Sequence, residues 1–301
     1  MSAKFLKDLR RNKYIYFMML PVVLYFLIFH YGPMFGMVIA FKDFSPVKGI
    51  MASKWVGFKN FQSFFSSIYF WQLIRNTLLI NFYDLIWGFP FPIIFALMLN
   101  EVRVIRFKKF VQTVTYLPHF ISIVVVCGMM VDFLRMDGIL NYITAVFGLP
   151  AKSYFLEEGL FRTIFVSSGI WQGFGWGSII YLSALTAIDP TLYEAAIVDG
   201  ASKWKQLIHV TLPGIAPTII IMFILRMGHM MSQGPEKILL LQNGANMALS
   251  EVISTFVYRR GILATNYSYS AAVGIFNSVV NFSFLLFFNH LSKKYSETSL
   301  Y

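Results

Sequence analysis

Few ionisable residues in this sequence could do chemistry, and three of them stand alone in long apolar stretches: Asp84, Arg226 and His229. A charge inside an apolar helix is costly, so each implies a partner or a polar pathway. The sequence offers no His, Cys, Asp and Glu cluster at metal-ligand spacing, no nucleophile–base arrangement and no carboxylate pair at catalytic spacing. The pattern therefore favours passage of a solute over catalysis, and it argues against an intramembrane enzyme.

The other isolated polar residues allow a second interpretation. Asp84 and Asp132 are carboxylates near or within apolar runs, which suggests ion-coupled transport as an alternative. We expect Asp132 at a membrane interface and Asp84 in a pair with a neighbour, with a proton relay as the weaker reading. His30 and His119 are each isolated and are expected to form hydrogen bonds rather than bind metal. The one cysteine, Cys127, permits no intrachain disulfide and no cysteine-based metal site.

The elements that must position these residues follow from the composition. Hydrophobic residues make up 57% and charged residues 13% of the 301 residues, and the mean hydropathy is +0.63. About 20 apolar residues span a bilayer, and four runs without Asp, Glu, Lys or Arg are long enough. This predicts a polytopic membrane protein, in which the net charge of +11 reflects basic loops beside anionic lipid rather than nucleic-acid binding. The four runs are Tyr14–Phe41, Phe110–Val131, Thr163–Ile188 and Gly261–Ser292.

The predicted fold is all-α, because the runs lack the alternation of a membrane barrel. The basic start of the chain (Lys4, Lys7, Arg10, Arg11 and Lys13) precedes a run too long for a signal peptide, so we expect an uncleaved first helix. Lys and Arg are denser in segments 1–13, 100–111, 187–213 and 291–301 than in 42–72, 134–160 and 233–268. The positive-inside rule then places both termini in the cytoplasm. The six expected spans are about 14–41, 73–99, 112–133, 161–186, 214–232 and 269–290.

Two loops carry amphipathic patterns. Trp55, Phe58, Phe61, Phe64 and Phe65 recur at helical spacing, which predicts an external helix lying in the membrane interface. On the internal side, basic residues alternate with apolar ones over 103–111, which predicts an elbow helix. Neither pattern specifies a function.

The most informative segment is the internal loop 187–213. Asp189 can cap a helix, Pro190 suits its first turn, and Gly200 suits a left-handed stop. Ser202 can cap a second short helix that runs to Pro213. The expected result is a helix–turn–helix with a shallow surface, because its alanines would let another protein approach closely.

This loop resembles a known family. The residues Glu194-Ala195-Ala196, then Asp199-Gly200-Ala201, and Leu212-Pro213 match the cytoplasmic loop motif of binding-protein-dependent ABC importer permeases. The resemblance implies that these residues dock on an ATP-hydrolysing subunit. We find no phosphate-binding loop of the form G-x-x-x-x-G-K-[ST], so no cofactor is expected on this chain, and ATP and Mg²⁺ are expected in the partner.

A closer resemblance is to the oligosaccharide branch of these permeases, and it runs from the first span to the C-terminus. It implies a second homologous permease, two nucleotide-binding ATPase subunits, an extracellular lipid-anchored solute-binding protein and the bacterial cytoplasmic membrane. One departure is Gly234-Pro235-Glu236-Lys237, where the branch has an aromatic residue before Glu. The matching segments are Arg75-Asn76-Thr77, Asn100-Glu101-Val102-Arg103, Tyr116-Leu117-Pro118-His119-Phe120-Ile121-Ser122, Tyr258-Arg259-Arg260-Gly261, Tyr267-Ser268-Tyr269-Ser270, Phe276-Asn277-Ser278 and Ser296-Glu297-Thr298-Ser299-Leu300.

Candidate pathway residues lie in three spans. Gly169, Gly173 and Gly177 recur at four-residue spacing, which favours close helix packing. Nearby aromatic faces could instead contact sugar rings. Arg226 is expected either to pair with a carboxylate such as Asp84 or to contact the sugar. It lies on one predicted helical stripe with Met222, His229, Met230 and Gln233. The polar stripe of Gly274, Asn277 and Asn281 could line the pathway or bond between helices. The predicted pathway residues are Trp171, Gln172, Trp176, Arg226, His229, Asn277 and Asn281.

The predicted organisation has three parts. Residues 1–72 hold the internal N-terminus, the first span and the amphipathic external loop; 73–290 form the permease core with the coupling loop 187–213; and 291–301 form an internal tail. The expected function is import of oligosaccharides by alternating access, coupled to a separate ATPase.

Overall fold

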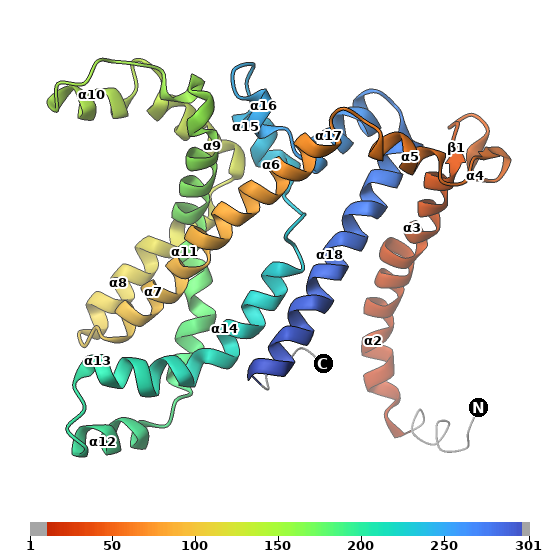
Figure 1. The fold of residues 1–301 in the computed structure, drawn as a ribbon. Coiled ribbons are helices and arrows are strands. Elements are labelled where there is room, and N and C mark those ends of the chain that lie inside the picture. Colours follow the sequence, from red (N-terminus) through yellow and green to blue (C-terminus); the bar gives the residue numbers. More distant parts are fainter. Residues whose placement is uncertain (1–10, 297–301) are drawn as a thin grey trace. The chain divides into compact units, whose positions relative to one another are not determined.

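The computed structural model describes residues 11–296, with side chains to residue 294 (Figure 1). The basic residues before position 11 and the matching segment that ends at Leu300 therefore lie largely outside the described part. The described chain is mainly helical. Four of its helices are long and apolar enough to cross a membrane, or up to five if a bent pair counts as one span. The four are Lys13–Phe41, Phe70–Asn100, Lys203–Met227 and Tyr267–Lys294, and the bent pair is Ile105–Phe120 with Ile123–Val146.

The chain divides into two units, and the long helix α18 (Tyr267–Ser296) runs from one into the other. Unit 1 joins the N-terminal segment to residues 259–276. It departs from the all-α prediction in one place, where two short antiparallel strands pair Lys42 with Trp55. Asn60 fastens this hairpin by donating to the carbonyl oxygens of Ala40 and Lys42 at 2.8 and 3.1 Å. The elements are α2 (Lys13–Phe26), η1 (Leu27–Tyr31), α3 (Gly32–Met34), η2 (Phe35–Phe41), β1 (Lys42–Asp43), α4 (Gly49–Ala52), β2 (Lys54–Trp55) and α5 (Lys59–Phe65).

The amphipathic external pattern in unit 1 forms a shorter helix than expected. Trp55 belongs to β2, and α5 begins only at Lys59. Phe64 is fully buried against Phe276, with ring centroids 5.4 Å apart, while Phe58 and Phe65 remain exposed. Apolar residues of α5 therefore serve both a protein core and an outer surface.

Unit 2 is built around α11 (Phe161–Thr186), which contacts most of the other helices of the unit. In Figure 1, α10 and α12 lie at opposite ends of this unit. The elements are α6 (Phe70–Tyr83), η3 (Asp84–Gly88), α7 (Pro90–Asn100), α8 (Ile105–Tyr116), η4 (Leu117–Phe120), α9 (Ile123–Leu134), α10 (Ile139–Val146), η5 (Tyr154–Leu156), η6 (Glu158–Leu160), α11, α12 (Pro190–Val198), α13 (Lys203–Gln206), η7 (Leu207–Thr211), α14 (Leu212–Met227), α15 (Pro235–Leu241), α16 (Met247–Ser250) and α17 (Ile253–Val257); η8 (Tyr258–Leu263) follows at the boundary with unit 1.

The helix α11 coincides with the fourth expected span but is not among the apolar candidates above. It is 26 residues long and contains glycine, serine and glutamine. Other helices surround it, and ten of its residues are buried. Because ten residues of α11 are covered by the rest of the protein, this helix does not need a uniformly apolar surface.

The third expected span is not a straight helix. Its two halves are bent by 97° at a break after Phe120. Pro118 starts a tight turn in η4, and Ile121 and Ser122 have extended backbones, so the helical hydrogen bonds are interrupted there. The predicted internal elbow helix is the first half of this broken element, α8, and not a separate helix.

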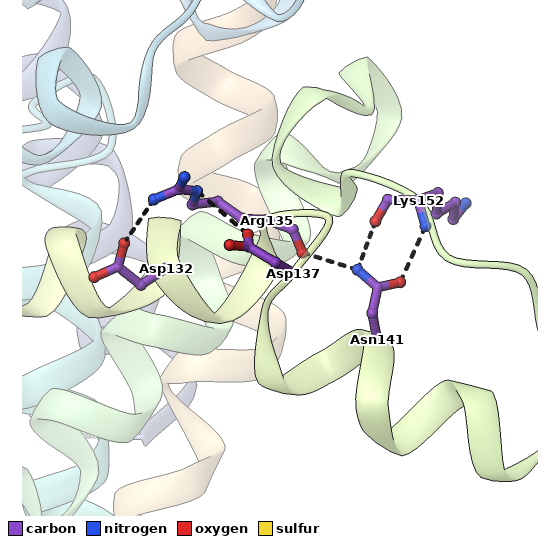
Figure 2. Close-up of polar contacts among 5 residues, drawn as sticks. All are labelled: Asp132, Arg135, Asp137, Asn141 and Lys152. Atoms are coloured by element: carbon purple, nitrogen blue, oxygen red, sulfur yellow. Dashed lines mark hydrogen bonds and ion pairs between the residues drawn. The ribbon is translucent and has the colours of Figure 1, made fainter.

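Beyond α9, the chain forms a segment around α10 with its own polar framework (Figure 2). The amide of Asn141 donates to the carbonyl oxygens of Arg135 and Lys152, both at 2.8 Å, and its oxygen accepts from the Lys152 N–H at 3.0 Å. Arg135 lies between Asp132 and Asp137 at 3.6 Å from each. Asp132 is exposed, at the end of α9. The segment around α10 therefore has a defined fold, because the buried side chain of Asn141 joins Arg135 before the helix to Lys152 after it.

Candidate functional site

A cavity of about 420 Å³ lies in unit 2, between η3, α7, α11 and the outer part of α14. Its walls are mostly apolar. Besides the phenol of Tyr181, its ionisable lining residues are Asp84, Arg226 and His229. This composition is typical of a site that accepts a small ligand and orients it by a few polar groups. The full lining is Asp84, Gly88, Phe89, Pro92, Gly169, Ile170, Gly173, Phe174, Gly177, Tyr181, Met222, Leu225, Arg226 and His229.

One wall of the cavity is the glycine stripe of α11. A Cβ added to Gly173 would meet no atom within 4 Å, so this glycine faces open space. Gly177 lies against Pro92 of α7, at 3.3 Å from a would-be Cβ. The predicted close packing is therefore found at Gly177, and at Gly169 against Lys237 of α15, but not at Gly173. The tightest helix contact of α11 is instead at Gly175, where a Cβ would overlap the backbone of Thr115 in α8.

Arg226 and Asp84 form an ion pair at the edge of this cavity. The Asp84 side chain is 16% exposed and the Arg226 side chain 43%. Gly88 makes room for the carboxylate, because a Cβ there would lie 2.7 Å from Asp84 Oδ1. The structure thus contains the ion pair that the sequence offered as one alternative, while the guanidinium also lines the cavity.

The predicted stripe of span five does not continue past Arg226. The helix α14 ends at Met227 and Gly228 follows as its cap, so His229 lies on a turn. Met230 is buried, and Gln233 donates to Asn81 Oδ1 at 2.8 Å. Of this stripe, Met222, Arg226 and His229 face the cavity.

The aromatic candidates lie outside the cavity lining. Trp176 stacks on His119 of η4, with ring centroids 4.7 Å apart and planes within 2°. Gln172 donates to the carbonyl oxygen of Ile121 at 3.0 Å, which ties α11 to the break in the third span. Trp171 is partly exposed. A sugar contact by any of the three stays a prediction.

The polar residues of α18 have different surroundings. Asn281 is buried; its oxygen accepts from the Met231 N–H at 2.7 Å, and its amide donates to Ser232 Oγ at 2.7 Å. It therefore holds the turn after α14. The Asn277 oxygen is buried and has no hydrogen-bond partner among the described residues. Their role in a pathway stays a prediction.

Lys237 lies in the segment 233–268 between the fifth and sixth expected spans, and the sequence analysis gave it no role of its own. It belongs to α15, whose Ile238 and Leu241 are buried in the core with Phe165. Its ammonium donates to the Phe165 carbonyl oxygen at 2.6 Å. The only local signal was the apolar run that follows it, since the contact with α11 joins segments far apart in the sequence.

The coupling segment begins with a capped helix, α12. The Asp189 carboxylate accepts the Thr191 N–H at 2.9 Å, and Pro190 is the first helical residue. The hydrogen bonds from Thr191 hold the pKa of the Asp189 carboxyl below its usual value. Gly200 has φ of +73°, and the Ala201 N–H bonds back to the Ala196 carbonyl oxygen at 2.8 Å. The predicted caps are all found.

The second helix of the segment differs from the prediction. Ser202 caps α13, but the helix does not stop at Pro213; it continues through η7 into α14. The π-helical turn η7 widens the backbone just before Pro213, where the proline ring would otherwise meet the preceding turn. Tyr193 Oη lies 3.0 Å from Thr211 Oγ1, so α12 is tied to the base of α14.

The outer surface of α12 is apolar and exposed. Leu192, Ile197 and Val198 point outward, and Val198 is 86% exposed. Glu194 and Ala195 are also exposed. Within the described residues, no group of three or more His, Cys, Asp or Glu could hold a metal ion.

The chain has apolar membrane-spanning helices, a cavity lined by an ion pair and an exposed apolar helix, α12. These features are typical of a membrane transport permease. The chain belongs to the family described as binding-protein-dependent transport system inner membrane component, whose model matches residues 74–297. It is thus a multi-pass protein of the bacterial cytoplasmic membrane.

Two relatives from Bacillus subtilis (strain 168) are similar over nearly the whole chain. The polygalacturonan/rhamnogalacturonan transport system permease protein YteP is 43% identical over 99% of this chain and 93% of its own length. Protein LplB is 42% identical over 97% of this chain and 92% of its own length.

The fold is similar to solved structures of a bacterial transporter that imports the acidic polysaccharide alginate. One chain has a TM-score of 0.89 and 42% identity, and the match covers 97% of this chain and 99% of that chain. A second, in complex with an alginate pentasaccharide-bound periplasmic protein, has a TM-score of 0.89 and 41% identity over 98% and 99%.

Proposed function

We propose that this chain is a permease subunit of an ATP-driven importer for oligosaccharides released from acidic polysaccharides. Pectin-type polymers and alginate, named for the similar proteins, are rich in uronic acids, whose carboxylates are anionic at neutral pH. A guanidinium can bind such a carboxylate in a forked geometry. The cavity that Arg226 lines supports this substrate class. The comparisons give no support to the ion-coupled alternative.

The proposed topology has six spans with both termini in the cytoplasm and α11 as the fourth span. The location of α10 and α12 at opposite ends of unit 2 supports it, because the charge pattern assigns their loops to opposite sides (Figure 1). In this topology α10 faces the extracellular solute-binding protein and α12 faces the cytoplasm. The core at 73–290 would carry the coupling loop 187–213, with 1–72 before it and 291–301 as a tail.

In the proposed complex, α12 docks on a separate ATPase subunit that binds ATP and Mg²⁺, and this chain binds no cofactor. Two such subunits and a second homologous permease complete the transporter, since one chain supplies half of a pathway. The observation that carries this proposal is the capped, exposed apolar surface of α12 with Glu194 at its centre. Exposed apolar patches of this kind mark protein-interaction sites.

The docking is tested by Gly200→Val and Glu194→Lys. A β-branched residue at φ of +73° strains the turn after α12, and Glu194→Lys reverses a charge expected to meet a basic residue on the ATPase. We expect both variants to reach the membrane but to lose uptake and co-purify poorly with the ATPase. The matched control is Gly148→Val, because Gly148 also has φ of +73° but follows α10 at the other end of unit 2. Normal uptake by both α12 variants would disprove docking through this segment.

A further inference from the structure

Lys237 is a partly buried lysine whose ammonium lies against an apolar core. Its neighbours Ile238 and Leu241 on α15 are almost fully buried, in one cluster with Cys127, Phe165 and Val252. Its Nζ donates to the Phe165 carbonyl oxygen at 2.6 Å and lies 4.5 Å from the centroid of the Phe165 ring. Among the residues that the structure describes, no carboxylate lies within 4 Å of this nitrogen.

A lysine in such surroundings lowers the stability of the fold. Burial lowers the pKa of Lys237 to about 8, so the side chain still carries its charge at neutral pH. An apolar residue of the same length would fill the space without an unpaired charge. A buried charge without a counterion is therefore a sign of function.

The position of the ammonium connects it to the transport cavity. A Cβ added to Gly169 would lie 3.0 Å from Lys237 Nζ, and Gly169 is a lining residue of the cavity. Because residue 169 has no side chain, the ammonium reaches the α11 backbone and abuts the cavity wall. Lys237 itself is not a lining residue, so it acts on the cavity through its field.

The charges around the cavity leave Lys237 uncompensated. Asp84 and Arg226 pair with each other, and their charges cancel. No other described carboxylate lies within 4 Å of the ammonium, so Lys237 adds a positive potential at the Gly169 end of the cavity. The apolar surroundings of Lys237 weaken screening, which makes this potential stronger than that of a surface lysine.

We propose that Lys237 is a charge-selectivity residue, which draws a carboxylate of the oligosaccharide into the cavity at Gly169. This inference rests on the proposed function, because it requires an acidic oligosaccharide to pass this cavity. It assigns charge discrimination to two residues, a lysine outside the cavity and a glycine that lets its ammonium approach. Arg226, which also lines the cavity, then holds a different part of the cargo.

The test uses the complete transporter in proteoliposomes with its solute-binding protein. Uptake is measured for an acidic oligosaccharide and for the same oligosaccharide with its carboxylates reduced to alcohols, each at a concentration that saturates the binding protein. For Lys237→Met we expect uptake of the acidic sugar to fall about tenfold and uptake of the reduced sugar to change less than about twofold. Lys54→Met is the matched control, since Lys54 is exposed on β2, and it should change neither rate.

A second variant tests the same idea while keeping the charge. Gly169→Ala places a methyl group 3.0 Å from the ammonium and pushes it away from the wall. We expect the ratio of acidic-sugar uptake to reduced-sugar uptake to fall, but by less than in Lys237→Met. An equal loss for both sugars in Lys237→Met, or unchanged uptake of both, would overturn the inference and leave the proposed function intact. If the wild-type transporter took up only the reduced sugar, the proposed substrate class itself would be wrong.

Discussion

The ion pair between Arg226 and Asp84 predicts strong coupling between two substitutions. Removing one partner leaves an unpaired charge at an apolar cavity, and removing both leaves none. With side chains 43% and 16% exposed, the pair lies between the surface and the interior. At an effective dielectric constant near 20, unit charges 4 Å apart attract by about 4 kcal/mol. Screening of the half-exposed guanidinium and desolvation of the carboxylate reduce this, so we expect a coupling free energy of about 2 kcal/mol.

The assay is a double-mutant cycle on the purified complex. Unfolding is followed for wild type, Arg226→Gln, Asp84→Asn and the double variant. The exposed pair of Arg135 and Asp132 is the matched control, with side chains 59% and 72% exposed, and its coupling should stay below about 0.5 kcal/mol. A coupling at the cavity as small as this control would refute the reasoning, because the pair would then contribute nothing beyond a surface contact.

The same cycle separates the two roles of Arg226. If the guanidinium contacts the cargo, the double variant recovers stability but not uptake of the acidic oligosaccharide. We expect this outcome, because Arg226 lines the cavity as well as pairing with Asp84. Full recovery of uptake together with stability would assign the pair a purely structural role.

Three further predictions use other features of the structure. Gly175→Ala should destabilise the complex by about 2 kcal/mol or more, because α8 leaves no room for a methyl group, whereas Gly173→Ala faces open space and should fold normally in the same thermal assay. Burial lowers the pKa of Lys237 to about 8 from an ordinary 10.5. Between pH 8 and pH 10.5, Lys237 therefore binds a proton in the unfolded chain that it lacks in the folded chain. Stability should therefore rise from pH 8 to 10.5, and this rise should be absent in Lys237→Met. In a background without the native cysteine, a cysteine at Lys48 should react with an impermeant thiol reagent in intact cells and one at Lys203 should not; the reverse pattern would invert the proposed topology.

Local sequence signals predicted the elements whose cause is local. The caps at Asp189 and Ser202 and the left-handed Gly200 depend on residues only a few positions apart, and all three are found. Breaks within helices were harder to predict from the sequence, because a proline can either end a helix or be accommodated within it. Pro118 accompanies a break, whereas the helix passes through Pro213 after a π-helical turn.

In the candidate site, too, local features were predictable from the sequence and long-range contacts were not. The lone charges Asp84 and Arg226 are conspicuous in apolar runs, so their pairing could be proposed from the sequence. Lys237 was missed, because a cation beside Glu236 in the segment 233–268 between two spans carries no local sign of burial. Its burial depends on contacts between α15 and α11, and single-sequence patterns do not report such long-range packing.

The glycine wall of α11 determines how the cavity can recognise a sugar. At Gly169, Gly173 and Gly177 this wall has no side-chain donor to fit one pattern of hydroxyl groups, so under the proposed function epimers would differ little in their contacts at these positions. An oligosaccharide that forms few hydrogen bonds at this surface can move along it without a deep energy minimum at each sugar ring. Under the proposed function, stereochemical recognition would then belong to the solute-binding protein, and the membrane step would discriminate charge more than ring configuration.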